Sequence, residues 1–163
     1  MLILASNRLT SLDPSLFVNL VKLQRLFLGG NKLISLDPSL FNNLANLQLL
    51  SLSRNQLTFL DPSLFVNLTN LQNLDLNSNH LTSLHPQLFG NLFSLTFLNL
   101  SSNSLETISQ SVFGNINNKY TIKIYLQGNP FTNNTSEVPV CGENTNSACY
   151  CSFDDNGDDV ECK

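Results

Sequence analysis

Apolar and polar positions recur along this chain with a constant, 24-residue period. One complete period, residues 23–46, reads LQRLFLGGNKLISLDPSLFNNLAN and opens on Leu23-x-x-Leu26-x-Leu28, followed by Asn31. Because apolar and variable positions alternate at the end of that opening motif, it predicts a short, half-buried strand. Each period is therefore predicted to contribute one strand and one return arm.

Three columns keep the same register through five periods, which indicates a true internal repeat. They are Asn7, Asn31, Asn55, Asn79 and Asn103; Leu9, Leu33, Leu57, Leu81 and Leu105; and Phe17, Phe41, Phe65, Phe89 and Phe113. A single period has too few apolar residues to close a core of its own. Burial then requires neighbouring coils to stack, so arrays of three or more are expected to fold cooperatively.

The residues between the strands predict how each coil turns. An asparagine side chain can both donate and accept hydrogen bonds, so Asn31 and its equivalents are expected to satisfy buried peptide groups at the turn. Asp37 and Pro38 provide a capping oxygen and a fixed φ, which predicts a short helical turn. Leu40, Phe41 and Leu44 are expected to point inward from the return arm.

The last period departs from the spacing. The interval from Asn103 to Asn129 is two positions longer than the interval from Asn79 to Asn103, yet Ile122, Ile124 and Leu126 still alternate. We therefore predict a sixth strand preceded by a two-residue insertion. At the other end, the segment Leu2-Ile-Leu4 matches only the strand portion of a period, so we expect the first repeat to be truncated.

The composition of the chain disfavours several classes of function. Leucine provides 33 and asparagine 24 of the 163 residues, while only 12% of the chain is charged. The chain up to Val140 is nearly neutral and has no basic stripe, which disfavours nucleic-acid binding. No apolar run reaches the length of a membrane span. No catalytic constellation surrounds His80 or His85, so we expect no enzymatic activity and no cofactor.

All four cysteines lie near the end of the chain, at Cys141, Cys149, Cys151 and Cys162. This clustering predicts a disulfide-bonded cap over the open end of the stack. Two alternatives are a zinc site, disfavoured because no C-x-x-C motif is present, and free thiols in a cytosolic protein. The acidic run at residues 154–159 lacks the spacing of a calcium-binding loop. We expect no metal site.

The 24-residue pattern resembles the extracellular leucine-rich repeat family. The segments LFLGGNKL, LFNNLANLQ and LFVNLTNLQNLDLNSNHLTSL are similar to Toll-like receptors, Slit-type guidance proteins and variable lymphocyte receptors. The resemblance implies an α/β fold: a right-handed solenoid with a concave parallel sheet and short helical or irregular convex arms. It assigns residues 1–131 to about six repeats and residues 132–163 to a linker with a cysteine-rich flanking cap.

The type of cap is left open by the residues. Gly128-Asn129-Pro130-Phe131 is similar to the usual entry to a trailing cap, whereas the order of lone, paired and lone cysteines resembles a leading cap. The leading-cap resemblance implies bridges Cys141–Cys151 and Cys149–Cys162. It also implies that the chain is a monomeric fragment of a larger ectodomain.

The resemblance implies extracellular recognition of a protein or glycan on the concave strand face, in a receptor or adhesion protein of innate immunity. The alternatives are a structural spacer and an intracellular interaction scaffold or inhibitor. The expected ligand-binding residues are Arg25, Phe27, Leu49, Ser51, Asn73, Asp75, Phe97, Lys123 and Tyr125. The candidate glycosylation sites are Asn67, Asn99, Asn133 and Asn134, about as many as chance produces in so asparagine-rich a chain.

Overall fold

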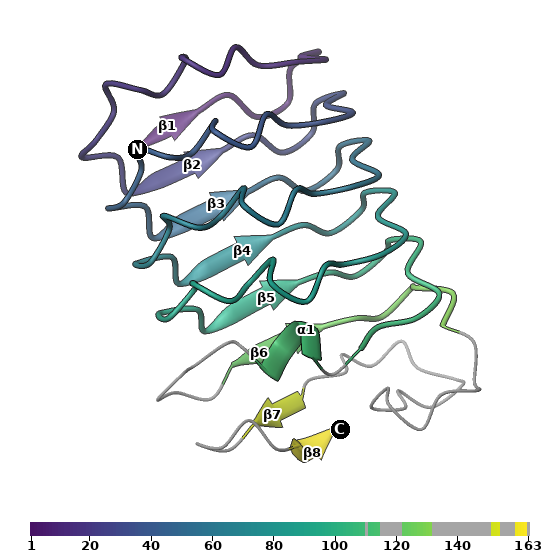
Figure 1. Ribbon diagram of the computed structural model, residues 1–163. Helices are drawn as coiled ribbons and strands as arrows, with labels where there is room; N and C mark the ends of the chain where they lie inside the picture. Colours follow the sequence, from purple (N-terminus) through teal and green to yellow (C-terminus); the bar gives the residue numbers. More distant parts are fainter. Residues whose placement is uncertain (110, 115–121, 132–150, 154–158, 163) are drawn as a thin grey trace.

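The computed structural model describes residues 1–109, 111–114, 122–131, 151–153 and 159–162. Its main feature is a six-stranded sheet in which strands follow one another in chain order, each contributed by one coil (Figure 1). The strands are β1 (Leu2–Ile3), β2 (Arg25–Phe27), β3 (Leu49–Ser51), β4 (Asn73–Asp75), β5 (Phe97–Asn99) and β6 (Lys123–Tyr125). All five pairings are parallel. The predicted solenoid with a parallel sheet is confirmed.

The register of the sheet follows the sequence period. Leu26 pairs with Leu50, which pairs with Leu74 and then Leu98, so equivalent leucines form one row across the sheet. Ile124 continues this row opposite Leu98 despite the two-residue insertion before it, which confirms the predicted sixth strand. In β2 to β6 the central residue is buried while its two neighbours face outward.

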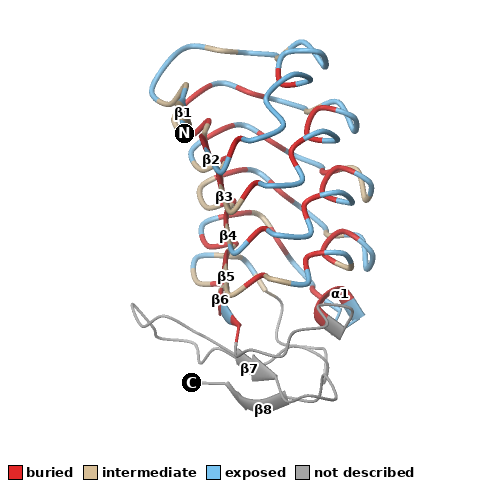
Figure 2. Cartoon of the chain, turned by 90° about the vertical axis from the view of Figure 1, so that its left-hand side faces the viewer, coloured by how far each residue is buried: buried red, intermediate tan, exposed pale blue. Residues whose placement is uncertain are grey.

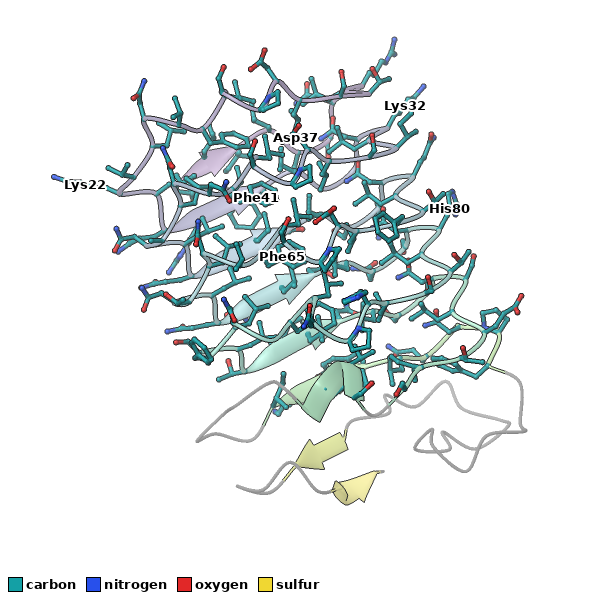
Figure 3. All side chains as sticks on the ribbon, in the orientation of Figure 1. Lys22, Lys32, Asp37, Phe41, Phe65 and His80 are labelled. Carbon is teal, nitrogen blue, oxygen red and sulfur yellow. The ribbon has the colours of Figure 1, made fainter. Side chains whose placement is uncertain are left out.

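The core lies between the strands and the return arms. Buried residues line the inside of every complete coil, and exposed residues lie along its outer side (Figure 2). The phenylalanine column forms a stack of nearly parallel rings. The ring centroid of Phe41 lies 6.2 Å from that of Phe17 and 6.4 Å from that of Phe65. Phe65 lies 6.5 Å from Phe89. Figure 3 shows Phe41 and Phe65 one below the other within the coils. Apolar burial thus occurs between neighbouring coils, as the repeat predicts.

The buried asparagine column forms a hydrogen-bonded ladder. Asn79 Oδ1 accepts from the backbone N–H of Leu57 at 3.1 Å, and its Nδ2 donates to the carbonyls of Leu52 and Leu76 at 3.0 and 3.1 Å. Equivalent bonds are made by Asn31, Asn55, Asn103 and Asn129. Each asparagine therefore joins its own turn to the preceding coil, as expected from its two-sided amide.

The convex arms of the first four coils are turns rather than helices. In the second coil, Leu40 N–H donates to Asp37 O and Asn42 N–H donates to Ser39 O, both at 3.0 Å. These bonds span three residues, which is the spacing of a tight turn and not of an α-helix. A turn therefore forms where the sequence predicts one, but it does not extend into a helix. Among the described residues, the one α-helix is α1 (Ser111–Gly114).

The aspartates that start these arms form Asx turns. Asp37 Oδ1 accepts from Ser39 N–H at 2.8 Å and from Ser39 Oγ at 2.6 Å, and the same pair of bonds occurs at Asp13 and Asp61. The fourth coil has His85 at this position, where Nδ1 accepts from Gln87 N–H at 3.1 Å. The capping role predicted for Asp37 is confirmed, and histidine can substitute for it.

These aspartates predict a dependence of stability on pH. The hydroxyl hydrogen bond from the serine two residues later, followed by its backbone N–H, lowers the pKa of Asp13, Asp37 and Asp61 in the folded chain. A lowered folded-state pKa stabilises the fold above the unfolded-state pKa, about 3.9 for aspartate. We expect this stabilisation to decline as the pH falls below that value and to be lost below the folded-state pKa.

Urea unfolding between pH 7 and pH 2 measures this effect. The triple variant Asp13→Asn, Asp37→Asn, Asp61→Asn keeps the accepting oxygens but cannot titrate, so its stability should fall less steeply in acid. Equal acid sensitivity of the two proteins would show that the Asx turns do not contribute to the pH dependence.

A second sheet consists of β7 (Cys151–Phe153) and β8 (Asp159–Cys162), which pair antiparallel with the backbone of Cys151 opposite that of Cys162. Cys141, Cys149 and the linker at residues 132–140 lie outside the described residues. The cap and its bridges therefore stay predictions.

Candidate functional site

Two rows of side chains project outward from the six-stranded sheet. One row runs through Arg25, Leu49, Asn73, Phe97 and Lys123, and the other through Ile3, Phe27, Ser51, Asp75, Asn99 and Tyr125. We call these eleven residues the sheet face. All nine predicted ligand-binding residues belong to it, brought together from five coils by the parallel register. Ile3 and Asn99 complete the rows.

A hollow forms where small side chains alternate with larger ones. Ser51 lies between Phe27 and Asp75 in one row, and Asn73 lies between Leu49 and Phe97 in the other. The hollow has a volume of about 210 Å³ and is lined by Phe27, Leu49, Leu50, Ser51, Asn73, Asp75 and Phe97. Leu50, buried beneath the face, is the one lining residue that the outward pattern did not include.

Hydrogen bonds orient the polar groups of the sheet face. Asp75 Oδ1 accepts from Asn77 Nδ2 at 2.6 Å and from Asn77 N–H at 3.2 Å. In the next coil, Asn99 Oδ1 accepts from Ser101 Oγ at 2.6 Å and from Ser101 N–H at 3.1 Å. The Asp75 carboxylate is thus fixed in place by its neighbour, which reduces the entropic cost of using it to bind a ligand.

The charges of the sheet face are well separated. Arg25 lies on β2, Asp75 on β4 and Lys123 on β6, and both basic residues are exposed. With neighbouring strands about 4.8 Å apart, the two basic residues lie roughly 19 Å from each other, with the carboxylate midway along the sheet. The register neighbours of Asp75 are the uncharged Ser51 and Asn99. One negative centre therefore has positive charges on either side.

Aromatic and aliphatic groups occupy the space between these charges. The rings of Phe97 and Tyr125 lie 5.1 Å apart in a tilted arrangement, and Phe27 and Leu49 are half-buried on the other side of the hollow. Partly exposed aromatic residues next to polar ones are characteristic of protein-binding surfaces. The arrangement favours binding over chemistry, because it places a single carboxylate among uncharged side chains.

The remaining candidate residues lie elsewhere. His80 and His85 are exposed on the turn and the convex arm, away from the sheet face. Within the described residues, no group of three or more His, Cys, Asp or Glu is arranged to hold a metal ion. No described helix combines the length and the apolar character needed to span a bilayer.

The glycosylation candidates fall in different places. Asn67 is exposed on a return arm, where its Nδ2 donates to the carbonyl of Asn42 at 3.1 Å. Asn99 is half-buried on the sheet face, so a glycan there would obstruct it. Asn133 and Asn134 lie outside the described residues.

A parallel sheet built from repeated coils, with an internal asparagine ladder and an outward row of variable side chains, defines a leucine-rich solenoid. Sequence comparison agrees: the Leucine rich repeat family model matches residues 1–57, 23–81 and 69–131. The chain belongs to the leucine-rich repeat family. This family provides scaffolds for protein interaction. No curated protein matches the sequence closely enough to count as a relative.

Solved structures show the same fold. A chain in the structure of the Toll–Spatzle complex of Drosophila, described as a molecular hub in development and innate immunity, is 35% identical with a TM-score of 0.73. The match covers 78% of this chain and 17% of that chain. In the glycosylated form of that complex, a chain is 36% identical with a TM-score of 0.70, over 75% of this chain and 16% of that one. The present chain thus spans about a sixth of the length of those chains.

Proposed function

We propose that this chain is an extracellular protein-recognition module that binds its ligand on the sheet face, within a receptor or adhesion protein. The observation that carries the proposal is the composition of that face. Apolar and aromatic side chains line the hollow together with three polar ones, and Arg25 and Lys123 lie outside it. Aromatic and apolar surface next to a few polar groups, with charged residues at the rim, is typical of a protein–protein interface.

The size of the hollow favours a protein ligand over a free small molecule. Pockets that enclose small ligands have volumes of about 300–1,000 Å³, whereas this hollow measures about 210 Å³. It can take one side chain or one sugar ring of a larger ligand. The rest of the contact would then come from the rows on either side.

Several features support an extracellular location. The chains of similar fold are from the Toll–Spatzle complex, a hub in development and innate immunity, and one of the two is in a glycosylated form of that complex. The four clustered cysteines are typical of an oxidising compartment. A linker and a disulfide-bonded cap at residues 132–163, following repeats at residues 1–131, complete the proposed organisation.

The double variant Phe27→Ala, Tyr125→Ala tests the proposed binding face. A panel of recombinant secreted proteins and ectodomains from the same organism provides the partner, and surface plasmon resonance measures its affinity. We expect the double variant to weaken binding by at least tenfold, because Phe27 lines the hollow, Tyr125 packs beside Phe97, and aromatic hot-spot residues contribute more than about 1 kcal/mol each.

Phe59→Ala is the matched control. Phe59 is an equally large aromatic residue, 56% exposed, and it lies outside the sheet face. Its replacement should leave the affinity unchanged. A partner that binds the double variant as tightly as the parent protein would place the binding surface elsewhere on the coils.

A further inference from the structure

We infer that the hollow of the sheet face receives a basic side chain, arginine or lysine, from the protein ligand. This inference rests on the proposed function and specifies the chemistry of the ligand at its centre. It follows from three properties of the hollow: the sign of its charge, the nature of its walls and its size.

The only charged group lining the hollow is the carboxylate of Asp75. Its Oδ1 accepts two hydrogen bonds from Asn77, both from uncharged donors, and its register neighbours Ser51 and Asn99 carry no charge. Arg25 and Lys123 lie two strands away on either side. The negative charge is thus held in position without a basic residue next to it in the sheet, and a cation from the ligand would complement it.

The walls fit the remainder of a basic side chain. Phe27, Leu49 and Phe97 provide apolar and aromatic surface around the hollow. The methylene groups of arginine and lysine pack well against such surface, while the charged end reaches a polar partner. A cation beside a phenylalanine ring gains a further attraction from the face of the ring. An acidic ligand side chain would meet the opposite conditions and be repelled.

The polar groups beside Asp75 provide further hydrogen-bond acceptors for a basic side chain. The Ser51 hydroxyl and the Asn73 amide also line the hollow, and both contain oxygen atoms that can accept hydrogen bonds. A guanidinium group, with five donors in one plane, could use several of these acceptors together.

The outer charges indicate what should surround the basic residue in the ligand. Arg25 and Lys123 lie on opposite sides of Asp75, each about 10 Å away across the strands. A ligand segment with a basic residue at its centre and acidic residues about three positions to either side would match all three charges. The same pattern disfavours binding of the ligand segment in a shifted position, because moving it by two strands would place its charges next to like charges of the sheet face.

The test uses two peptides that differ only in the charge of one side chain. The ¹⁵N-labelled full chain is titrated with acetyl-Gly-Gly-Arg-Gly-Gly-amide and with the same peptide carrying citrulline, the neutral isostere of arginine. Amide shifts in two-dimensional NMR spectra report both the site and the affinity. We expect the arginine peptide to move the resonances of Ser51, Asn73 and Asp75 in a saturable way and to bind at least tenfold more tightly than the citrulline peptide.

Two variants complete the design. Asp75→Asn retains an oxygen that can accept from Asn77 but removes the charge, and it should abolish the preference for arginine over citrulline. Asp37→Asn removes a carboxylate from a convex arm and should leave that preference unchanged. Equal binding of the two peptides, or shifts that avoid β3 to β5, would overturn the inference.

The outcome is separable from that of the proposed function. If the chain binds the arginine and citrulline peptides equally while Phe27→Ala, Tyr125→Ala still weakens partner binding at least tenfold, the sheet face binds protein but its hollow does not select a cation. If partner binding survives that double variant, the proposed function itself fails whatever the peptides show.

Discussion

Replacing Phe65 with alanine is expected to lower the free energy of unfolding by about 3–5 kcal/mol, the range observed for large aromatic residues removed from a packed core. Phe65 is fully buried and lies between Phe41 and Phe89 in the aromatic stack. Its removal leaves a cavity between two coils that neither neighbour can fill alone. Urea unfolding followed by circular dichroism measures the change.

Phe59→Ala serves as the comparison in the same experiment. Phe59 lies shortly before Phe65 in the same coil but is 56% exposed, so its loss removes little buried surface. We expect its effect to remain within about 0.5 kcal/mol, as for ordinary surface substitutions. Similar losses for the two variants would contradict the assignment of the phenylalanine column to the core.

The second large effect concerns the asparagine ladder. Asn79→Ala removes four hydrogen bonds at once and leaves the N–H of Leu57 without the acceptor that the structure assigns to it. The unpaired N–H of Leu57 costs roughly 1–3 kcal/mol and each lost hydrogen bond to a carbonyl roughly 0.5–1.5 kcal/mol, because Asn55 and Asn103 still donate to the carbonyls of Leu52 and Leu76. We therefore expect a total loss of about 3 kcal/mol or more. Urea unfolding measures this loss, which is large although asparagine is a polar residue in an apolar interior.

Asn67→Ala provides the matched control for the ladder. Asn67 also bonds to the preceding coil, through one exposed contact to the carbonyl of Asn42. Water can replace that contact, so the variant should lose less than about 1.5 kcal/mol. An Asn67 variant as unstable as the Asn79 variant would show that burial of the ladder is not what makes it important.

The sequence predicted the parts of this structure that follow from its period. Because Leu26, Leu50, Leu74 and Leu98 recur at one constant interval, one strand per coil and one parallel register satisfy all of them together. The internal asparagine column was predictable for the same reason. An additional exposed ladder, formed by Asn43, Asn67 and Asn91, was missed even though it has the same spacing.

The turn after each strand was only partly visible in the sequence. Gly30 and Gly128 adopt positive φ angles of 68° and 73° there, and glycine at these positions is a recognisable signal. The equivalent residues in the other coils are Ser6, Arg54, Ser78 and Ser102, with φ between 53° and 57°. Serine and arginine do not indicate a positive φ in a sequence, so the left-handed backbone at these positions, which the tertiary packing imposes, could not be predicted.

The hollow of the sheet face could not be predicted from the repeat. It depends on which side chains become neighbours across strands, such as Ser51 beside Phe27 and Asn73 beside Phe97. The repeat determines that these positions face outward, and the variable residues decide the relief and charge of the surface. This division explains why the fold was easier to predict than the ligand.

We infer that the coils are stabilised from within and that the sheet face contributes to binding rather than to stability. Measuring the free energy of unfolding and the partner affinity of Phe27→Ala, Tyr125→Ala on the same preparation separates these two contributions. We predict a stability within about 1.5 kcal/mol of the parent protein, allowing for the Phe97–Tyr125 ring contact, together with at least a tenfold loss of affinity. A loss of stability as large as that of Phe65→Ala, or an unchanged affinity, would contradict it.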